Sequence, residues 1–356
     1  MNRTTDHDTR PIVGITHGDI NSISYEIIIK AFVDNRIFEL LTPVVYGSSK
    51  IASYHRKTLN VSDFSFNLIK RADTANPKRA NIINIHDQEV KIDLGKSTGI
   101  AGELALLALE AATEDLKKNY LDVLVTAPIN KKNIQSKDFH FPGHTEYLAD
   151  KFGVTDYLML MVSNKLRIGV ITGHIPLKEV LNQLNEELIL RKIKILNQSL
   201  LQDFGIRSPR IAILGLNPHA GDEGLIGQEE AQIIKPAIDK ANELGMRVFG
   251  PFPADGFFGS STFTQFDGIL AMYHDQGMLP FKALAFDSGV NFTAGLPIVR
   301  TSPAHGTAYE IAGKDLASPD SFRAALYLAC DIFYNRQEYK TMTENPLQAA
   351  KQEAEH

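Results

Sequence analysis

Three histidines in similar surroundings could together hold a divalent metal ion. Each follows an apolar segment with the length of a buried strand: His174 after residues 166–172, His219 after residues 211–216 and His274 after residues 268–273. Close pairs of ligands are typical of zinc fingers, whereas such distant ligands are typical of a catalytic site assembled from several strand ends. Three imidazoles favour zinc, cobalt or another borderline ion over magnesium, which prefers oxygen. Each histidine alone has a simpler interpretation, a hydrogen bond that caps its strand.

A second group of polar residues follows His274 in a segment that is otherwise poor in charge. Lys282, Asn291 and Arg300 supply an ammonium, an amide and a guanidinium group. Lysine and arginine form charge-assisted hydrogen bonds with phosphate and carboxylate groups. The grouping therefore indicates an anionic substrate held beside a metal ion or a general base.

His144 and Thr145 directly follow a rigid turn at residues 141–143. That turn could present both side chains to a ligand. An equally open interpretation makes Thr145 the N-cap of a helix, with Glu146 in its first turn.

Asp255 and Asp275 are the candidate acids for proton transfer or for supporting a neighbouring group. Asp255 is a lone acid among proline, phenylalanine and glycine, a setting that solubility explains poorly, and Asp275 directly follows His274. Asp222 and Glu223 lie in a glycine-flanked segment and are expected in an exposed loop.

The composition is that of an ordinary globular protein and argues against several functional classes. The 356 residues exceed one typical core, and 44% are hydrophobic and 22% charged. A net charge of -5 argues against a general nucleic-acid surface, and no apolar run approaches the length of a membrane helix. The single cysteine, Cys330, excludes an intrachain disulfide, and its apolar neighbours predict a buried thiol. Together with a polar start unlike a signal peptide, these features predict a cytoplasmic protein.

Alternating strand and helix patterns predict an α/β fold with mainly parallel strands. Strands are expected at residues 11–16, 41–46, 121–126, 157–162, 166–172, 211–216 and 268–273, and helices at residues 24–32 and 102–119. Residues 164–165 predict a hairpin turn. Asn185 predicts the N-cap of a long helix, whose buried stripe comprises Ile189, Ile193, Leu196 and Leu200. Residues 62–93 carry no clear pattern.

Four segments are long and specific: TAPINK at residues 126–131, FPGHTEYLAD at 141–150, NPHAGDEGLIGQEE at 217–230, and residues 273–314 with GLPIVRTSPAHGTAYEIAGK. They closely resemble the 4-hydroxythreonine-4-phosphate dehydrogenase family of pyridoxal phosphate biosynthesis. Residues 302–313 also resemble, more distantly, the adenosine-binding loop of the isocitrate and isopropylmalate dehydrogenases, whose fold the family shares. The resemblance implies a two-lobed α/β/α fold with its active site in the interlobe cleft at a dimer interface. The first lobe is expected at residues 11–137 plus 305–356, and the second at residues 138–304.

The resemblance also assigns roles residue by residue. It implies one divalent ion (zinc, cobalt or magnesium) per site, bound by His174, His219 and His274. It implies a homodimer in which His274 completes a site formed by His174 and His219 of the other chain. The implied substrate contacts are His144, Thr145, Lys282, Asn291 and Arg300. The adenosine end of NAD or NADP is expected on the backbone of His305, Gly306, Thr307 and Ala308.

The implied reaction is metal-dependent, NAD(P)-linked oxidation of 4-phosphohydroxy-L-threonine to a 2-amino-3-oxo acid, followed by decarboxylation to 3-amino-2-oxopropyl phosphate. A sister activity on threonate or erythronate 4-phosphate is open, as are a metal-dependent phosphohydrolase and a non-catalytic binding protein. One departure bears on this choice, since the family's GDPAGIGPE-type turn reads GDINSISYE at residues 18–26. Glycines in such turns permit close approach of the backbone to a ligand, so their loss leaves room for a variant substrate.

Overall fold

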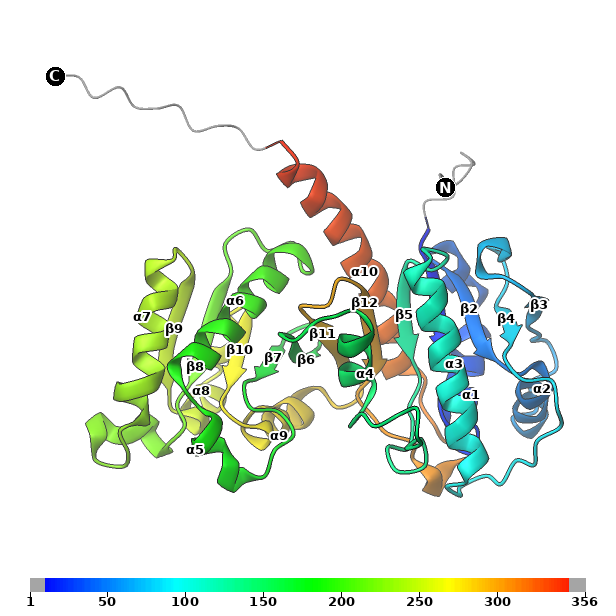
Figure 1. The fold of residues 1–356 in the computed structure, drawn as a ribbon, viewed down its shortest axis with the longest axis horizontal. Coiled ribbons are helices and arrows are strands. Elements are labelled where there is room, and N and C mark those ends of the chain that lie inside the picture. The colour runs from blue at the N-terminus through cyan, green and yellow to red at the C-terminus, as the bar shows by residue number, and fades with distance from the viewer. Residues whose placement is uncertain (1–9, 346–356) are drawn as a thin grey trace.

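The computed structural model describes residues 10–345, which form one twisted sheet with helices on both faces (Figure 1). The strand order is β3-β4-β2-β1-β5-β12-β11-β6-β7-β10-β8-β9. The strands are β1 (Ile12–Thr16), β2 (Thr42–Gly47), β3 (Asn67–Ile69), β4 (Asn81–Asn84), β5 (Val123–Thr126), β6 (Leu158–Val162), β7 (Arg167–Val170), β8 (Arg210–Leu214), β9 (Arg247–Phe252), β10 (Gly268–Ala271), β11 (Val290–Ala294) and β12 (Val299–Pro303).

Most neighbouring strands are parallel, as the alternation of strands and helices predicted. The exceptions lie at the centre, where β11 is antiparallel to both β12 and β6, and where β6 and β7 form the predicted hairpin. The strands in one half of the sheet therefore run opposite to most strands in the other half. Because a large sheet twists, the carboxyl ends of the strands in both halves nevertheless open toward the same side, the lower one in Figure 1.

The α-helices are α1 (Ser24–Phe32), α2 (Ser49–Thr58), α3 (Gly99–Lys117), α4 (His144–Lys151), α5 (Val180–Gln183), α6 (Glu186–Gln202), α7 (Lys235–Glu243), α8 (Ala254–Gly259), α9 (His274–Ala285) and α10 (Asp320–Thr343). Short helical turns are η1 (Asn35–Glu39), η2 (Ala72–Thr74), η3 (Leu177–Glu179), η4 (Pro218–Gly224), η5 (Glu230–Ile234), η6 (Thr262–Gln265) and η7 (Tyr309–Ile311). Among residues 10–345, no helix has both the length and the apolar character needed to cross a membrane.

Most predicted elements lie close to their expected bounds. α1 occupies the predicted residues 24–32, and α3 begins and ends slightly before the predicted residues 102–119. Asn185 caps α6 as predicted, because its side-chain oxygen accepts a hydrogen bond from the backbone N–H of Leu188 at 2.9 Å. The predicted apolar stripe of α6 is fully buried. Residues 62–93, which carried no clear pattern, contain β3 and β4.

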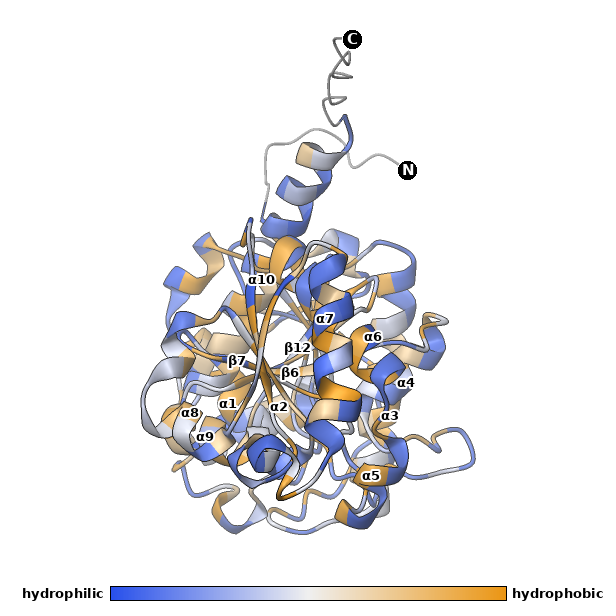
Figure 2. Cartoon of the chain, turned by 90° about the vertical axis from the view of Figure 1, so that its left-hand side faces the viewer, coloured by the Kyte–Doolittle hydropathy of each residue, from blue (hydrophilic) through white to orange (hydrophobic). Residues whose placement is uncertain are grey.

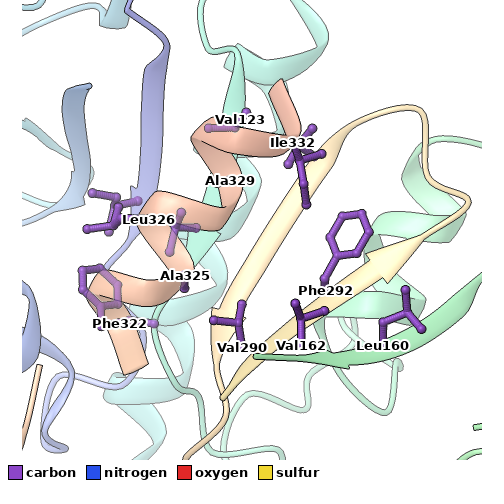
Figure 3. Close-up of a cluster of buried hydrophobic side chains, with 14 of the residues drawn as sticks. Val123, Leu160, Val162, Val290, Phe292, Phe322, Ala325, Leu326, Ala329 and Ile332 are labelled. Atoms are coloured by element: carbon purple, nitrogen blue, oxygen red, sulfur yellow. The ribbon is translucent and has the colours of Figure 1, made fainter. Parts of the chain in front are cut away.

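Helix α10 covers the centre of the sheet (Figure 3) and packs on β5, β11 and β12. Figure 2 shows that apolar residues follow the strands, whereas polar residues prevail on the outer faces of the helices. The packed residues are Val123, Leu160, Val162, Val290 and Phe292 of the strands and Phe322, Ala325, Leu326, Ala329 and Ile332 of α10. Cys330 is buried as predicted, and this burial raises the pKa of its thiol to about 12.

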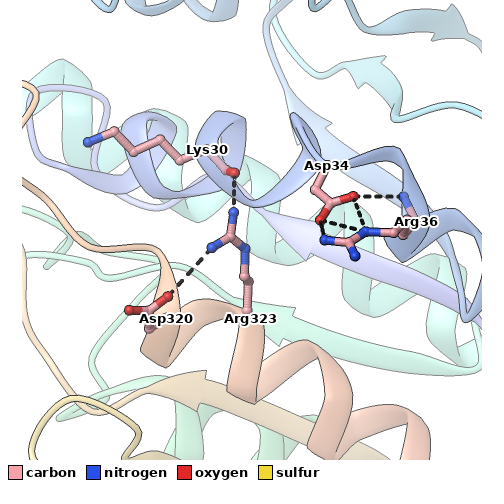
Figure 4. Close-up of polar contacts among 5 residues, drawn as sticks. All are labelled: Lys30, Asp34, Arg36, Asp320 and Arg323. Carbon is pink, nitrogen blue, oxygen red and sulfur yellow. Dashed lines mark hydrogen bonds and ion pairs between the residues drawn. The ribbon is translucent and has the colours of Figure 1, made fainter.

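Polar contacts fix the start of α10 against α1 (Figure 4). Arg323 Nη2 donates to the backbone oxygen of Lys30 at 2.7 Å, and Arg323 Nη1 lies 3.5 Å from Asp320. Close by, Arg36 Nε donates to Asp34 Oδ1 at 2.9 Å at the start of η1. The last helix of the described chain is thus attached to the first.

Two buried histidines flank Tyr25 in an aromatic stack. The ring centroids of His17 and Tyr25 are 5.4 Å apart, and those of Tyr25 and His55 are 5.1 Å apart. Burial lowers the pKa of both histidines to about 4. His55 Nε2 also lies 2.8 Å from the backbone oxygen of Ile20. Both rings are therefore neutral in the folded chain at neutral pH.

The stack predicts a loss of stability in mild acid. The ordinary histidine pKa is 6.5, whereas His17 and His55 have pKa values of about 4 in the folded chain. The unfolded state therefore binds more protons between these values, and the free energy of unfolding falls as the pH decreases through them. We expect a loss of roughly 3 kcal/mol per histidine at most, measured by urea unfolding across this pH range.

His17→Gln provides the control, because it removes one of the two titrating rings. Its free energy of unfolding should depend less steeply on pH than that of the wild type. If the two proteins show the same pH dependence, the stack does not cause the acid sensitivity.

Candidate active site

The three predicted metal histidines lie at the carboxyl ends of three adjacent parallel strands. In the order β7-β10-β8, His174 follows β7, His274 begins α9 after β10, and His219 lies in η4 after β8. The ring centroids of His174 and His274 are 5.1 Å apart. Across residues 10–345, however, no three histidine, cysteine, aspartate or glutamate side chains are grouped closely enough to hold a metal ion. One chain thus brings together His174 and His274, whereas the resemblance implied His174 and His219 as the pair from one chain.

His219 lies in a left-handed turn, and its side chain is exposed. The φ angles of residues 219–223 lie between 44° and 84°, a region that costs free energy for residues other than glycine. Buried Glu230 fixes the start of this segment, because its carboxylate accepts hydrogen bonds from the backbone N–H groups of Leu216 and Asn217 at 2.8 and 2.7 Å. The turn also exposes Asp222 and Glu223, as the sequence predicted.

A cavity of about 640 Å³ opens beside His174 and contains a large part of the predicted site. Its lining includes His144, Thr145, His174, Asn291, Arg300, His305 and Gly306. Other predicted residues lie outside it. Lys282 and Asp275 are exposed on α9, and Asp255 is exposed on α8. Asp275 Oδ1 lies 2.7 Å from His274 Nδ1, and Thr307 and Ala308 continue the loop that begins at His305.

Arg300 is a buried cation in the wall of this cavity. Its side chain begins on β12, and the residue is 3% exposed. Its Nη2 and Nε donate to Thr126 Oγ1 at 2.6 and 3.1 Å, but it forms no ion pair with any residue in the range 10–345. Burial lowers the pKa of Arg300 to about 10, and the negative charge of Glu146 opposes this effect. An unpaired buried charge is costly, and a bound anion would offset that cost.

The contact with Arg300 fixes the tautomer of His144. Arg300 Nη2 lies 3.1 Å from His144 Nδ1, and since arginine can only donate, Nδ1 is the acceptor and Nε2 carries the proton. His144 Nε2 is buried and has no hydrogen-bond partner. Burial, followed by the charges of Arg300 and Lys131, holds the pKa of His144 well below its usual value. His144 therefore offers a neutral N–H donor to a ligand.

Thr145 does not cap a helix, so that interpretation of the sequence is wrong. α4 begins at His144, and the N-cap is Gly143, which makes no side-chain hydrogen bond. The rigid turn thus starts the helix two residues earlier than a threonine cap at position 145 requires. Thr145 Oγ1 instead lies 3.2 Å from Thr293 Oγ1 of β11. Glu146 lies in the first turn, as expected.

Two further cavity residues have unpartnered buried polar atoms, which are Asn291 Oδ1 and His305 Nε2. His305 Nδ1 lies 3.1 Å from the backbone oxygen of Gly306. Burial lowers the pKa of His305, so its ring is neutral. An amide oxygen and an imidazole nitrogen are thus also available to a bound molecule.

The altered N-terminal turn is occupied by hydrogen bonds within the chain. Asn21 is buried and donates to the backbone oxygen of Lys96 at 3.1 Å and to Thr98 Oγ1 at 2.8 Å. Buried Asp19 accepts a hydrogen bond from the hydroxyl of Tyr309 at 2.7 Å. The replacement Asn21 therefore holds the segment before α3, and the retained Asp19 holds the start of η7.

Three charged cavity residues were missed by the sequence analysis: Lys131, Glu146 and Lys192. Lys131 follows a predicted strand, and Glu146 is adjacent to the predicted pair His144-Thr145. Their positions in the sequence could therefore have indicated that both lie near the site. Lys192 lies on α6, where a lysine is most often explained as part of a solvated helix face.

The fold is that of an α/β protein, with a buried and unpaired cation in the wall of its cavity. The family described as "Pyridoxal phosphate biosynthetic protein PdxA" matches residues 39–329. A 4-hydroxythreonine-4-phosphate dehydrogenase of Bacteroides thetaiotaomicron is 54% identical over 94% of this chain and 92% of that protein. A crystal structure of 4-hydroxythreonine-4-phosphate dehydrogenase from Klebsiella pneumoniae covers 92% of this chain and 99% of its own, with a TM-score of 0.79 and 34% identity. The chain belongs to the PdxA family, which confirms the resemblance read from its motifs.

Replacing the unpaired guanidinium should weaken anion binding while leaving the fold intact. In Arg300→Gln, we expect affinity for inorganic phosphate, measured by calorimetry, to fall roughly 10- to 100-fold, because a charge-assisted hydrogen bond is lost. The midpoint of thermal unfolding without ligand should stay unchanged or rise, since a buried charge is removed. Arg167→Gln, at a partly buried arginine outside this cavity, is the matched control. Unchanged phosphate affinity in Arg300→Gln would contradict the assignment.

Proposed function

We propose that the chain is a 4-hydroxythreonine-4-phosphate dehydrogenase. In this proposal it oxidises 4-phosphohydroxy-L-threonine with NAD or NADP to the 2-amino-3-oxo acid, which loses carbon dioxide to give 3-amino-2-oxopropyl phosphate. The observation that carries the proposal is the unpaired Arg300, buried in a cavity beside the paired imidazoles of a PdxA-family chain. A substrate with phosphate and carboxylate groups supplies the missing negative charge.

The donor set fits one divalent ion. We propose that His174, His219 and His274 hold it, with one of the imidazoles supplied by a second subunit. The support is that their strands are adjacent and parallel, and that two of the rings already lie 5.1 Å apart. A bound zinc, cobalt or magnesium ion would supply Lewis-acid stabilisation of negative charge on the substrate oxygen during oxidation and decarboxylation.

The residues of the chain itself bind and orient the substrate in this proposal. Arg300 and the N–H of His144 Nε2 bind its anionic groups, and Asn291 accepts a hydrogen bond through Oδ1. Thr145 contributes a hydroxyl beside them, and Lys282 comes from a subunit interface. The backbone of the loop from His305 through Gly306 and Thr307 to Ala308 holds the adenosine end of the nucleotide. Ala308 has a φ of 43°, which turns the chain sharply there.

The support for a homodimer is two exposed leucines that lie close in sequence to the histidines. Leu225, which follows His219 after η4, is 81% exposed, and Leu279, on the same helix as His274, is 71% exposed. On α9, Lys282 and Asp275 lie on the same helical face as Leu279, since residues three and four apart are neighbours. A second copy packed there would bring Lys282, and the proposed proton-transfer acid Asp275, toward its cavity.

Asp255 is exposed, so in this proposal it acts in proton transfer only if a partner or a conformational change brings it to substrate. We also propose two lobes, one at residues 11–137 plus 305–356 and one at residues 138–304, which includes the central strands β6, β11 and β12. Residues 346–356 of the first lobe lie outside the described part of the chain. The lone buried Cys330 supports a cytoplasmic location, where thiols stay reduced.

The main rival is a dehydrogenase of another phosphorylated four-carbon acid. A protein of Oceanobacillus iheyensis that is 36% identical over 91% of this chain is named putative D-threonate 4-phosphate dehydrogenase. Threonate and erythronate 4-phosphate share the phosphate and carboxylate groups that Arg300 attracts. A phosphohydrolase is less well supported, because it would have no use for a nucleotide loop.

Direct assay separates these activities. Incubating the protein with NAD or NADP, a divalent metal ion and 4-phosphohydroxythreonine should raise absorbance at the reduced-nicotinamide band. Threonate and erythronate 4-phosphate, assayed in parallel, should give lower rates. Release of phosphate without nicotinamide reduction would exclude the proposal, and a faster rate with threonate 4-phosphate would favour the rival.

Removing one proposed ligand should remove the metal. After incubation with zinc and gel filtration, His219→Ala is expected to retain much less metal than the wild type by elemental analysis, because two imidazoles hold zinc more weakly than three. Its circular dichroism should not change, since His219 is exposed. His140→Ala, at another exposed histidine outside the cavity, should retain wild-type metal content. Equal metal content in His219→Ala and wild type would refute the ligand assignment.

A further inference from the structure

The cavity contains one carboxylate among its charged lining residues, and the proposed site residues do not account for it. This is Glu146, which lies in the first turn of α4 and is partly buried. The other charged side chains of the lining are Lys131, Lys192 and Arg300. The cavity thus combines three cations with a single anion.

Within the described part of the chain, the Glu146 carboxylate forms neither a hydrogen bond nor an ion pair. An acid at this helix position often reaches back to the backbone N–H of the N-cap residue. Glu146 Oε2 comes close to Gly143, but no such hydrogen bond is made. Capping of α4 therefore does not explain why a carboxylate lies at this position in the cavity.

Glu146 lies in the wall of the same cavity as Arg300 and His174. Burial lowers the pKa of Arg300, and the negative charge of Glu146 opposes that lowering. A substrate bound in this cavity between the guanidinium and the proposed metal ligand therefore has the carboxylate of Glu146 beside it.

We propose that Glu146 binds the ammonium group of the substrate and so selects a 2-amino acid over a 2-hydroxy acid. This inference rests on the proposed function. The charged groups of the substrate complement those of the cavity. 4-Phosphohydroxythreonine carries a phosphate and a carboxylate, which suit the cations, and one ammonium group, which suits the single carboxylate. Threonate 4-phosphate has a neutral hydroxyl at the same carbon, which leaves the carboxylate of Glu146 without a counter-charge beside an anionic ligand.

Glu146→Gln tests this role, because it keeps the size of the side chain and removes its charge. For 4-phosphohydroxythreonine, kcat/KM should fall roughly 10- to 100-fold, mainly through a higher KM. For threonate 4-phosphate, kcat/KM should stay the same or rise. Asp150→Asn, at an exposed acid on the same helix, should change neither value. Circular dichroism confirms that each variant is folded.

The outcomes are distinct. Equal losses for both substrates would overturn the proposal, and a loss confined to kcat in both would instead make Glu146 a proton-transfer group. If the wild type oxidises neither substrate, the proposed function fails, and calorimetry on the zinc-loaded protein still decides the role of Glu146. A wild-type binding preference for the amino compound that disappears in Glu146→Gln supports the proposal, and a preference that persists, or is absent in the wild type, refutes it.

Discussion

A guanidinium buried without a counter-charge constrains the whole cavity. Arg300 is placed on β12 near the middle of the sheet and is almost fully buried, although it lines the cavity. The cost of burying its charge is partly offset by hydrogen bonds to the hydroxyl of Thr126 on β5 and the imidazole of His144 at the start of α4. Both contacts depend on the β12-β5 pairing and on the turn before α4. A positive charge in the cavity wall is thus maintained at a cost to the stability of the fold.

The central strands bring together groups from distant parts of the sequence. β11 runs against both neighbours, and it contributes Asn291 to the cavity and Thr293 to the contact with Thr145. The three histidines come from the other half of the sheet, at the ends of β7, β10 and β8. The buried guanidinium of Arg300 and the imidazole pair therefore belong to different halves of the sheet, which meet across the antiparallel centre.

Sequence patterns within single segments predicted most strands and helices of the fold. Contacts between segments that are distant in the sequence could not be predicted in this way. The strand ends of His174, His219 and His274 and the cap at Asn185 follow from local chemistry, and the structure places them as expected. The start of α4 was missed, because Gly143 adopts the N-cap position that Thr145 has the better side chain to fill. Lys192 reaches the cavity only through the packing of α6, and the separation of His219 depends on a left-handed turn that no local pattern indicates.

The position of β12 has a consequence for biosynthesis. This strand pairs with β5, although about 170 residues of chain separate them, and α10 follows later still. While the ribosome makes the intervening chain, β5 keeps an unpaired edge, and the apolar faces that α10 will cover stay open to solvent. The amino-terminal half therefore cannot finish folding before nearly the whole polypeptide has emerged, which makes the nascent chain a natural client for chaperones.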